Sequence, residues 1–270
     1  MNPRDESEKG IAYMSTPSTR PPHALRELDP ESVKKVKAAA VAAQAKAAPP
    51  EPAAAPGEHP GVERWPVKTG TDADWKSVGQ NTVKGEALGE GVVPTTVEEM
   101  LTLPRASNMP PVDQSFTKNS FYQNQRFAPT ETTIWKLTAT ITEAKLEQDG
   151  DYHLVLKGAS GKTMIGEIPN PDPAYVKNPD WLAKIKTARD AMDAQLGHPL
   201  APVDFKPEEM GVPTKERFES KPMKDETAAM TRIGLKATII GVGFFDSSHG
   251  QTGVAPSAIE LHPIFSIEFL

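Results

Sequence analysis

The chain contains no cysteine, which excludes disulfide bonds and zinc sites built from thiolates. It also lacks any stretch of roughly 20 apolar residues, the length that a membrane-spanning helix needs. Its first ten residues, MNPRDESEKG, contain no apolar core of a signal peptide. The missing cysteines fit a reducing compartment, so we expect a cytoplasmic protein with no membrane partner.

A basic excess is missing too. The formal net charge is −6, whereas domains that bind nucleic acid usually gather Lys and Arg on one face. The sequence has neither a Walker loop nor a G-x-S-x-G motif, so neither of these templates applies. A nucleic-acid partner would require a local basic patch that the total charge conceals.

Proline, by contrast, is abundant, with 27 residues unevenly placed. Residues 1–60 combine Pro, Ala and Glu with almost no aromatic residues, so they bury too little apolar surface to offset the entropy of ordering. We expect a disordered tail there. Within it, residues 29–48 have a plausible N-cap at Asp29, a proline in the first turn and many alanines, which predicts a helix. Its apolar face is mostly methyl groups, so we expect a transient helix, with a partner-binding helix as the alternative.

Residues 61–130 are expected to form an extension that wraps along the domain after them. Trp65 and Val67 are the strong apolar anchors of its first part. Thr95 or Thr96 can cap a short helix, TTVEEMLTL, which Pro104 ends. The segment lacks the apolar content for a core of its own.

Residues 131–270 carry the patterns of strands and one main helix. Three strands follow one another between residues 132 and 170, with an Asp-Gly turn between the first two. The alternation of the first strand slips near Thr142-Glu143, which predicts a bulge. A helix with one apolar stripe opens at Asn178-Pro179, and residues 197–231 are expected to form a long, lid-like loop.

Two further strands complete the pattern, at 235–245 and 259–269. The order strand-strand-strand-helix-strand-strand is that of a five-stranded Greek-key barrel, the OB-fold. We therefore predict a mainly β protein with some helix: an OB-fold-like barrel over 131–270 with one main helix, an N-terminal wrapping extension over 61–130 and a disordered tail over 1–60.

The motif K-x-x-x-DGD-x-x-x-L-x-x-K-G begins at Lys145, and the strand after it ends in Glu167-Ile168-Pro169. This pattern resembles the first three strands of staphylococcal-nuclease-like domains. In that family the second Asp of DGD and an Asp just before a Thr-Pro bind calcium, and an Arg from the third strand and a Glu just after the Pro serve catalysis. The resemblance implies that Asp151 and Glu167 are metal ligands and that Lys162 stands near the position of the Arg. Asn170 occupies the place of the catalytic Glu, and no second Arg is evident after the helix.

A second resemblance covers most of the chain beyond residue 60. The segments DGDYHLVL and EIP, with FFD-x-x-HGQ-x-G-x-AP and IELHP near the end, resemble a family of uncharacterised bacterial proteins. The ERWPVKTGTDAD stretch at 63–74 is similar to the start of those proteins. This resemblance implies no known activity.

The C-terminal run also holds four residues suited to metal binding or proton transfer. Glu260 and His262 are two apart on a strand and therefore share one face, while Asp246 and His249 lie in the preceding loop. His153 can join them from the second strand. Such a carboxylate–histidine cluster can bind a divalent cation, whether Ca, Mg, Mn or Zn, or serve as acid–base pairs. In the alternative, the loop residues bond their own backbone, and Glu260 and His262 form a solvated outer face.

Two functions therefore stay open. The first is an OB-fold-like binding or interaction module with an unknown ligand, and its partner is nucleic acid or another protein. The second is a divergent metal-dependent phosphodiesterase. The set for that enzyme has Lys162 as the phosphate contact, His249 or His262 as the general base, and metal ligands chosen from Asp151, Glu167, Asp246 and Glu260.

Overall fold

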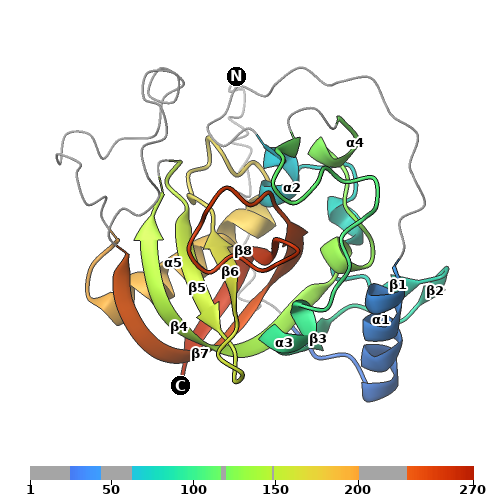
Figure 1. The fold of residues 1–270 in the computed structure, drawn as a ribbon, viewed down its shortest axis with the longest axis horizontal. Helices are drawn as coiled ribbons and strands as arrows, with labels where there is room; N and C mark the ends of the chain where they lie inside the picture. Colours follow the sequence, from blue (N-terminus) through green and yellow to red (C-terminus); the bar gives the residue numbers. More distant parts are fainter. Residues whose placement is uncertain (1–24, 44–62, 117–119, 148, 201–229) are drawn as a thin grey trace, which may run out of the picture.

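The computed structural model describes residues 25–43, 63–116, 120–147, 149–200 and 230–270. In this part of the chain the protein is mixed α/β with strands dominating (Figure 1). One six-stranded sheet has the order β3-β4-β5-β6-β8-β7, and β7 also pairs with β4, so five strands close into a ring. Its strands are β3 (Val92–Pro94), β4 (Ile134–Leu146), β5 (Tyr152–Lys157), β6 (Thr163–Ile168), β7 (Thr231–Phe245) and β8 (Ile259–Phe269).

Short elements cover the ring, together with one long helix. A small hairpin joins β1 (Thr82–Val83) and β2 (Glu86–Ala87). The helices are α1 (Pro30–Ala42), α2 (Trp65–Thr69), α3 (Val97–Met100), α4 (Ser120–Gln123) and α5 (Pro179–Leu196), with 3-10 turns at Trp75–Ser77 and Thr130–Thr132. Among the described helices, none combines the length and the apolar character that crossing a bilayer requires.

The bulge predicted for the first long strand is confirmed. The pairing of β4 shifts between Ile141 and Glu143 on both of its sides, toward β5 and toward β7. This bend lets one strand of 13 residues take part in both halves of the ring. The ring is completed by a parallel pairing of β6 with β8, where Ile165 stands opposite Glu260 and Gly166 opposite Leu261. A Cβ at Gly166 would lie 2.8 Å from side-chain carbons of Leu156 and Ile264, so this close packing requires glycine.

The main helix also follows its sequence signals. The Asn178 side chain accepts hydrogen bonds from the backbone N–H groups of Asp180 and Trp181, and α5 begins at Pro179. The helix ends before Gly197, which has a φ of 77°. The buried ring of Trp181 meets Phe265 of β8 edge to face, with centroids 5.0 Å apart. The predicted apolar stripe therefore packs against the last strand of the ring.

The expectation of a disordered tail over 1–60 fails for residues 25–43. In this segment α1 is formed and docked, with Val36 and Ala40 fully buried. Glu27 forms a parallel bridge with Val92 of β3, which ties the start of the segment to the edge of the sheet. Lys35 and Lys37 then form ion pairs with acids of the extension, at 2.7 and 2.8 Å. The small apolar face suffices because edge pairing and ion pairs add to it. The rest of the tail lies outside the described residues.

The other expected boundaries have mixed outcomes. The strand expected to resume at Leu235 begins at Thr231. Most of the expected lid-like loop over 197–231 lies outside the described residues. The short capped helix is present as α3, with Thr96 and Glu99 forming a reciprocal capping box.

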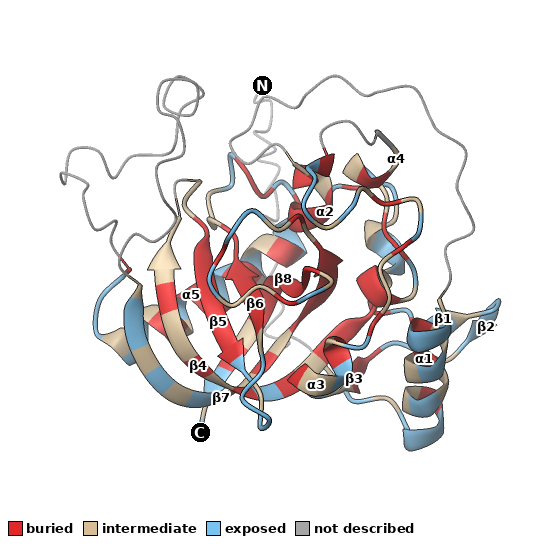
Figure 2. Cartoon of the chain, in the orientation of Figure 1, coloured by how far each residue is buried: buried red, intermediate tan, exposed pale blue. Residues whose placement is uncertain are grey.

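The extension shares one hydrophobic core with the ring, and Figure 2 shows buried residues in both parts. A fully buried ion pair fixes its first part. Arg64, just before α2, places its two terminal nitrogens 2.6 and 2.7 Å from the two carboxylate oxygens of Glu131. It also donates to the carbonyl of Phe245, at the end of β7. The guanidinium carbon also lies 4.8 and 4.5 Å from the ring centroids of Phe116 and Phe244. The extension is thereby joined to the ends of β4 and β7.

Replacing Glu131 with Gln or Ala should destabilise the protein strongly, because the Arg64 charge would remain buried without its partner. Breaking a buried pair of this kind costs about 3–5 kcal/mol. The matched control is Asp190→Ala, which removes an exposed pair with Lys186 and should change the free energy of unfolding by less than about 1 kcal/mol. Chemical denaturation of the full chain measures both. Equal, small effects would contradict the structural role given to Arg64.

Docking of α1 should depend on Val36. A Val36→Asp variant places a carboxylate in an apolar contact, which costs several kcal/mol unless the helix detaches. We expect hydrogen exchange over residues 30–42 to accelerate by about tenfold or more. The control is Val41→Asp, because Val41 is 56% exposed, and it should leave the exchange unchanged. Identical exchange in the two variants would show that α1 is not held by this face.

Candidate metal centre

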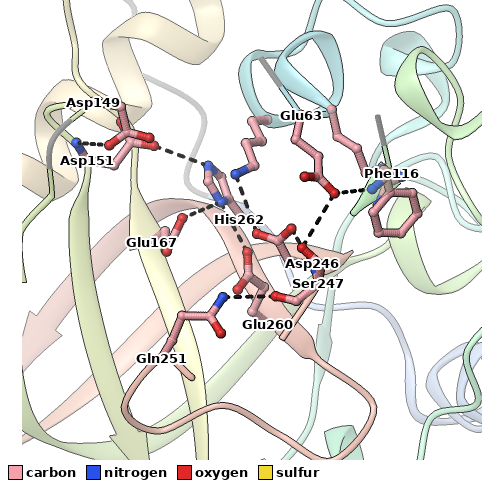
Figure 3. A network of polar contacts seen from close by, with 12 residues as sticks. Glu63, Phe116, Asp149, Asp151, Glu167, Asp246, Ser247, Gln251, Glu260 and His262 are labelled. Atoms are coloured by element: carbon pink, nitrogen blue, oxygen red, sulfur yellow. Dashed lines mark hydrogen bonds and ion pairs between the residues drawn. The ribbon is translucent and has the colours of Figure 1, made fainter. Parts of the chain in front are cut away.

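Five acidic and imidazole side chains meet on one face of three neighbouring strands. Asp151 and His153 come from the start of β5, Glu167 from the end of β6, and Glu260 and His262 from β8. Figure 3 shows Asp151, Glu167 and Glu260 around His262. His153 pairs directly with Glu167 across β5 and β6. The parallel pairing of β6 with β8 brings the other two alongside.

The expected solvated face for Glu260 and His262 is wrong. The two residues share a face, as the spacing predicts, but they are only 2% and 0% exposed. The loop between β7 and β8 covers the same face, since the carbonyl of Thr252 contacts His153. Lys68 of α2 adds to the cover and is itself buried. Strand alternation indicates which residues share a face, but not what later covers it.

His262 lies at the centre of the cluster. Its Nδ1 is 2.8 Å from Glu167 Oε2 and 3.2 Å from Glu260 Oε1, so this nitrogen carries the proton that it donates. Its Nε2 faces Asp151 Oδ2 at 3.7 Å. Both of these atoms are buried, and no group in the described part of the chain forms a hydrogen bond with either. Two electron-rich atoms therefore face each other without a hydrogen bond.

His153 has a defined orientation as well. Its Nε2 lies 2.9 Å from the carbonyl oxygen of Thr252 and must donate to it. Its Nδ1 then faces two carboxylate oxygens, Glu167 Oε1 at 3.3 Å and Glu147 Oε1 at 3.4 Å. Glu167 thus contacts one histidine through each of its oxygens.

The electrostatics follow from burial and crowding. Burial raises the pKa of Asp151 well above its usual value, and the nearby carboxylates of Asp149 and Glu167 add to this. Burial also raises the pKa of Glu260 well above normal, with Glu167 and Asp246 adding to the effect. Burial alone would raise the pKa of Glu167, but hydrogen bonds from the two histidines lower it well below normal. The site therefore holds negative charge on Glu167 and tends to take up protons elsewhere.

Lys68 supplies a nearby positive charge. Burial opposes its ionisation, but Asp246, Glu167 and Glu260 outweigh burial and raise the pKa of Lys68 well above its usual value. Its Nζ lies 3.5 Å from Asp246 Oδ2. Asp246 is therefore linked to the cluster through Lys68.

The structure brings together some of the residues singled out from the sequence and separates others. Asp151, Glu167, Glu260 and His262 converge. Lys162 is exposed in the turn at the other end of β5 and β6, a strand length from Glu167. His249 contacts Gln251 in its own loop and belongs to neither donor set found among the described residues.

Two participants were not selected from the sequence. Glu147 lies at the end of β4, in the same acidic turn as the DGD motif, and that acidic run was the available signal. Lys68 reaches the cluster because α2 docks across the strands. No sequence pattern near Lys68 predicts that position. Only its place inside the ERWPVKTGTDAD stretch singles it out.

The donors suit a divalent transition metal. Asp151, Glu167 and His262 each offer a ligand atom within 4.8 Å of the others. If an ion lay about 2.1 Å from both His262 Nε2 and Asp151 Oδ2, which are 3.7 Å apart, the N–ion–O angle would be about 120°. That angle is within the range of metal sites in proteins. Imidazole together with carboxylate favours Zn, Mn or Fe over Ca and Mg, which prefer oxygen ligands alone. The residues present therefore fit such an ion.

Comparisons with known proteins add no relative. No family model matches the chain, and neither a curated protein nor a solved structure matches it. The function is therefore argued from the geometry of the site.

In the metal-free protein the two histidines should titrate far apart. Burial lowers the pKa of both rings, but the hydrogen bonds that His153 donates to the carboxylates of Glu147 and Glu167 reverse this and raise its pKa to about 10. The pKa of His262 is lowered, with burial as the main cause and Lys68 adding to it. NMR of the imidazole nitrogens at pH 7 should therefore show His153 doubly protonated and His262 neutral.

The His153 contribution to stability has a defined sign. A raised folded pKa stabilises the fold fully below pH 6.5, the ordinary value, and this stabilisation is lost as the pH rises through about 10. A His153→Gln variant should lose that dependence in denaturation measured between pH 6 and 10. A neutral His153 ring at pH 7 would contradict the assignment.

Proposed function

We propose that the protein is an OB-fold-like binding module that holds a divalent transition-metal ion between Asp151 and His262, with Glu167 orienting the His262 ring through its Nδ1–H. The observation that carries the proposal is the pair of facing buried atoms, Asp151 Oδ2 and His262 Nε2, which no described group satisfies. A buried polar atom without a partner costs free energy, and an ion bound between them would remove that cost for both.

The ring itself supports the OB-fold-like assignment. Its strands β4, β5, β6, β7 and β8 are joined in the order first, second, third, fifth, fourth and back to the first. That is the Greek-key order of a five-stranded OB barrel, with the main helix placed between the third and fourth strands. A cytoplasmic location, expected from the missing cysteines, stays a prediction.

Burial favours binding over catalysis. Asp151 and His262 are 0% exposed and Glu167 is 6% exposed. A phosphodiester of a nucleic acid would have to reach the ion directly to be hydrolysed. An ion held by these side chains would instead join three strands of the ring.

The divergent phosphodiesterase is the second candidate, because the same convergence of Asp151, Glu167 and His262 would serve it. Two observations weigh against it. Lys162, the expected phosphate contact, is in a distant turn. Asn170, in the place of the family's catalytic Glu, uses its backbone N–H to bind Asp151 Oδ1 at 2.8 Å. The binding module is therefore the better supported function.

Thermal denaturation after chelation, with Zn²⁺, Mn²⁺, Ca²⁺ or Mg²⁺ added back, tests the proposal. We expect Zn²⁺ or Mn²⁺ to raise the Tm, since an ion at 100 times its Kd stabilises by about 2.7 kcal/mol. Asp151→Asn and His262→Gln should abolish the shift. Glu268→Gln, an exposed position on β8, should retain it. No shift in the unmodified protein, or equal shifts in all variants, would overturn the proposal.

Incubation of the metal-loaded protein with short DNA and RNA separates the two candidates. A binding module leaves these substrates intact. Cleavage that Asp151→Asn abolishes and Glu268→Gln preserves would replace the binding module with the phosphodiesterase. The same assay on Lys162→Gln then tests the phosphate contact assigned to that residue.

A further inference from the structure

Arg189 of α5 joins two turns at one end of the ring. It is only 8% exposed. Its Nη2 lies 2.7 Å from the carbonyl oxygen of Gly150, in the turn between β4 and β5. The same nitrogen lies 2.9 and 3.0 Å from the carbonyl oxygens of Ile168 and Pro169, at the end of β6. A charged donor thus binds both segments, and hydrogen bonds from charged donors are stronger than those from neutral ones.

The two segments carry one ligand of the proposed ion and the group that orients it. Asp151 comes directly after Gly150, and Asn170 comes directly after Pro169. The backbone N–H of Asn170 donates to Asp151 Oδ1 at 2.8 Å. With Oδ1 bonded in this way, Oδ2 is the oxygen that faces His262 Nε2, at 3.7 Å (Figure 3). The distance between the two segments therefore determines where the carboxylate points.

Contacts with β5 and α5 fix the guanidinium. Its carbon lies 3.4 Å from the centroid of the Tyr152 ring, as in a stacked pair. The Tyr152 hydroxyl donates to Asp193 Oδ1 at 2.7 Å and accepts the backbone N–H of Leu200 at 2.8 Å. The Nε of Arg189 is buried and has no hydrogen-bond partner among the described residues. The side chain is therefore held through Nη2 and the Tyr152 ring.

We propose that Arg189 is a positioning residue for the metal site. It holds the turn before Asp151 and the segment before Asn170 together, so that Asp151 Oδ2 faces His262 Nε2 before an ion arrives. Ligands that are already in place lose less freedom when the ion binds, so this preorganisation raises the affinity. This proposal rests on the proposed function and names a residue that sets the affinity of the same site.

Two substitutions separate the parts of this role. Arg189→Met keeps an apolar stem against Tyr152 but removes the charge and the donor to the three carbonyl groups. Arg189→Lys keeps a charged donor but cannot stack on the ring as a planar group. Loss of a group that orients metal ligands typically weakens metal binding by about 10–100-fold. We therefore expect a loss of that size in Arg189→Met and a smaller loss in Arg189→Lys.

Competition with a chromophoric chelator measures the Kd for Zn²⁺ in the full-length protein. Circular dichroism first identifies a temperature at which the variants are folded. The matched control is Lys186→Met, which removes a cation from the same helix. The Lys186 side chain is 62% exposed and pairs with Asp190, so this control should bind Zn²⁺ as the unmodified protein does.

Co²⁺ in place of Zn²⁺ provides a readout that a loss of stability alone does not change. The visible absorption of bound Co²⁺ depends on the arrangement of its ligands. At saturating Co²⁺ we expect Arg189→Met to alter the positions and intensities of the absorption bands, and Arg189→Lys to alter them less. Val36→Asp, which destabilises the docking of α1 instead, should keep the spectrum of the unmodified protein. If Arg189→Met does not fold, Arg189→Lys carries the test.

The outcomes separate the two proposals. If the Arg189 variants bind Zn²⁺ and Co²⁺ with unchanged affinity and spectrum, the positioning role is overturned and the metal-binding module stays in place. A spectrum that Val36→Asp changes as much as Arg189→Lys would also overturn the positioning role, because general loosening would then explain the effect. No bound ion in the unmodified protein would overturn the proposed function and the positioning role together.

Discussion

A concentration of negative charge, sealed on one strand face, is the constraint on which the rest of the site depends. Asp151, Glu167 and Glu260 are almost completely buried, beside two buried imidazoles. A buried charge without compensation is very costly, so positive charge must reach this face in some form. Protons on the carboxyl groups and on His153, the ammonium of Lys68 and divalent ions are alternative ways of supplying it. Protons, the Lys68 ammonium and divalent ions would therefore compete to neutralise the carboxylates of this face.

The short helix α2 connects this charge balance to the fold. Arg64, at its start, binds Glu131 and the end of β7. Lys68, one turn later, approaches Asp246 just after β7. The same few residues therefore hold the extension onto the ring and bring a cation to the acidic face. The cover and the electrostatics are thus not independent properties.

Local signals in the sequence predicted a good part of this arrangement. The bulge in β4, the cap of α5 at Asn178 and the shared face of Glu260 and His262 each follow from patterns a few residues long. The docking of α1 did not follow, because it depends on a sheet edge far away in the chain. The burial of the strand face and the arrival of Lys68 did not follow either. Both depend on contacts between segments that lie about a hundred residues apart in the sequence, and the periodicity of a single segment does not predict such contacts.

The ring closes where β6 meets β8, and this junction has two paired positions, whereas β4 and β7 share ten. The joined strands are also far apart along the chain, so bringing them together costs more chain entropy than forming a hairpin. Glu167 stands on one side of this junction and Glu260 and His262 on the other. An ion bound between these strands would add a link across the junction that has the fewest paired positions in the ring.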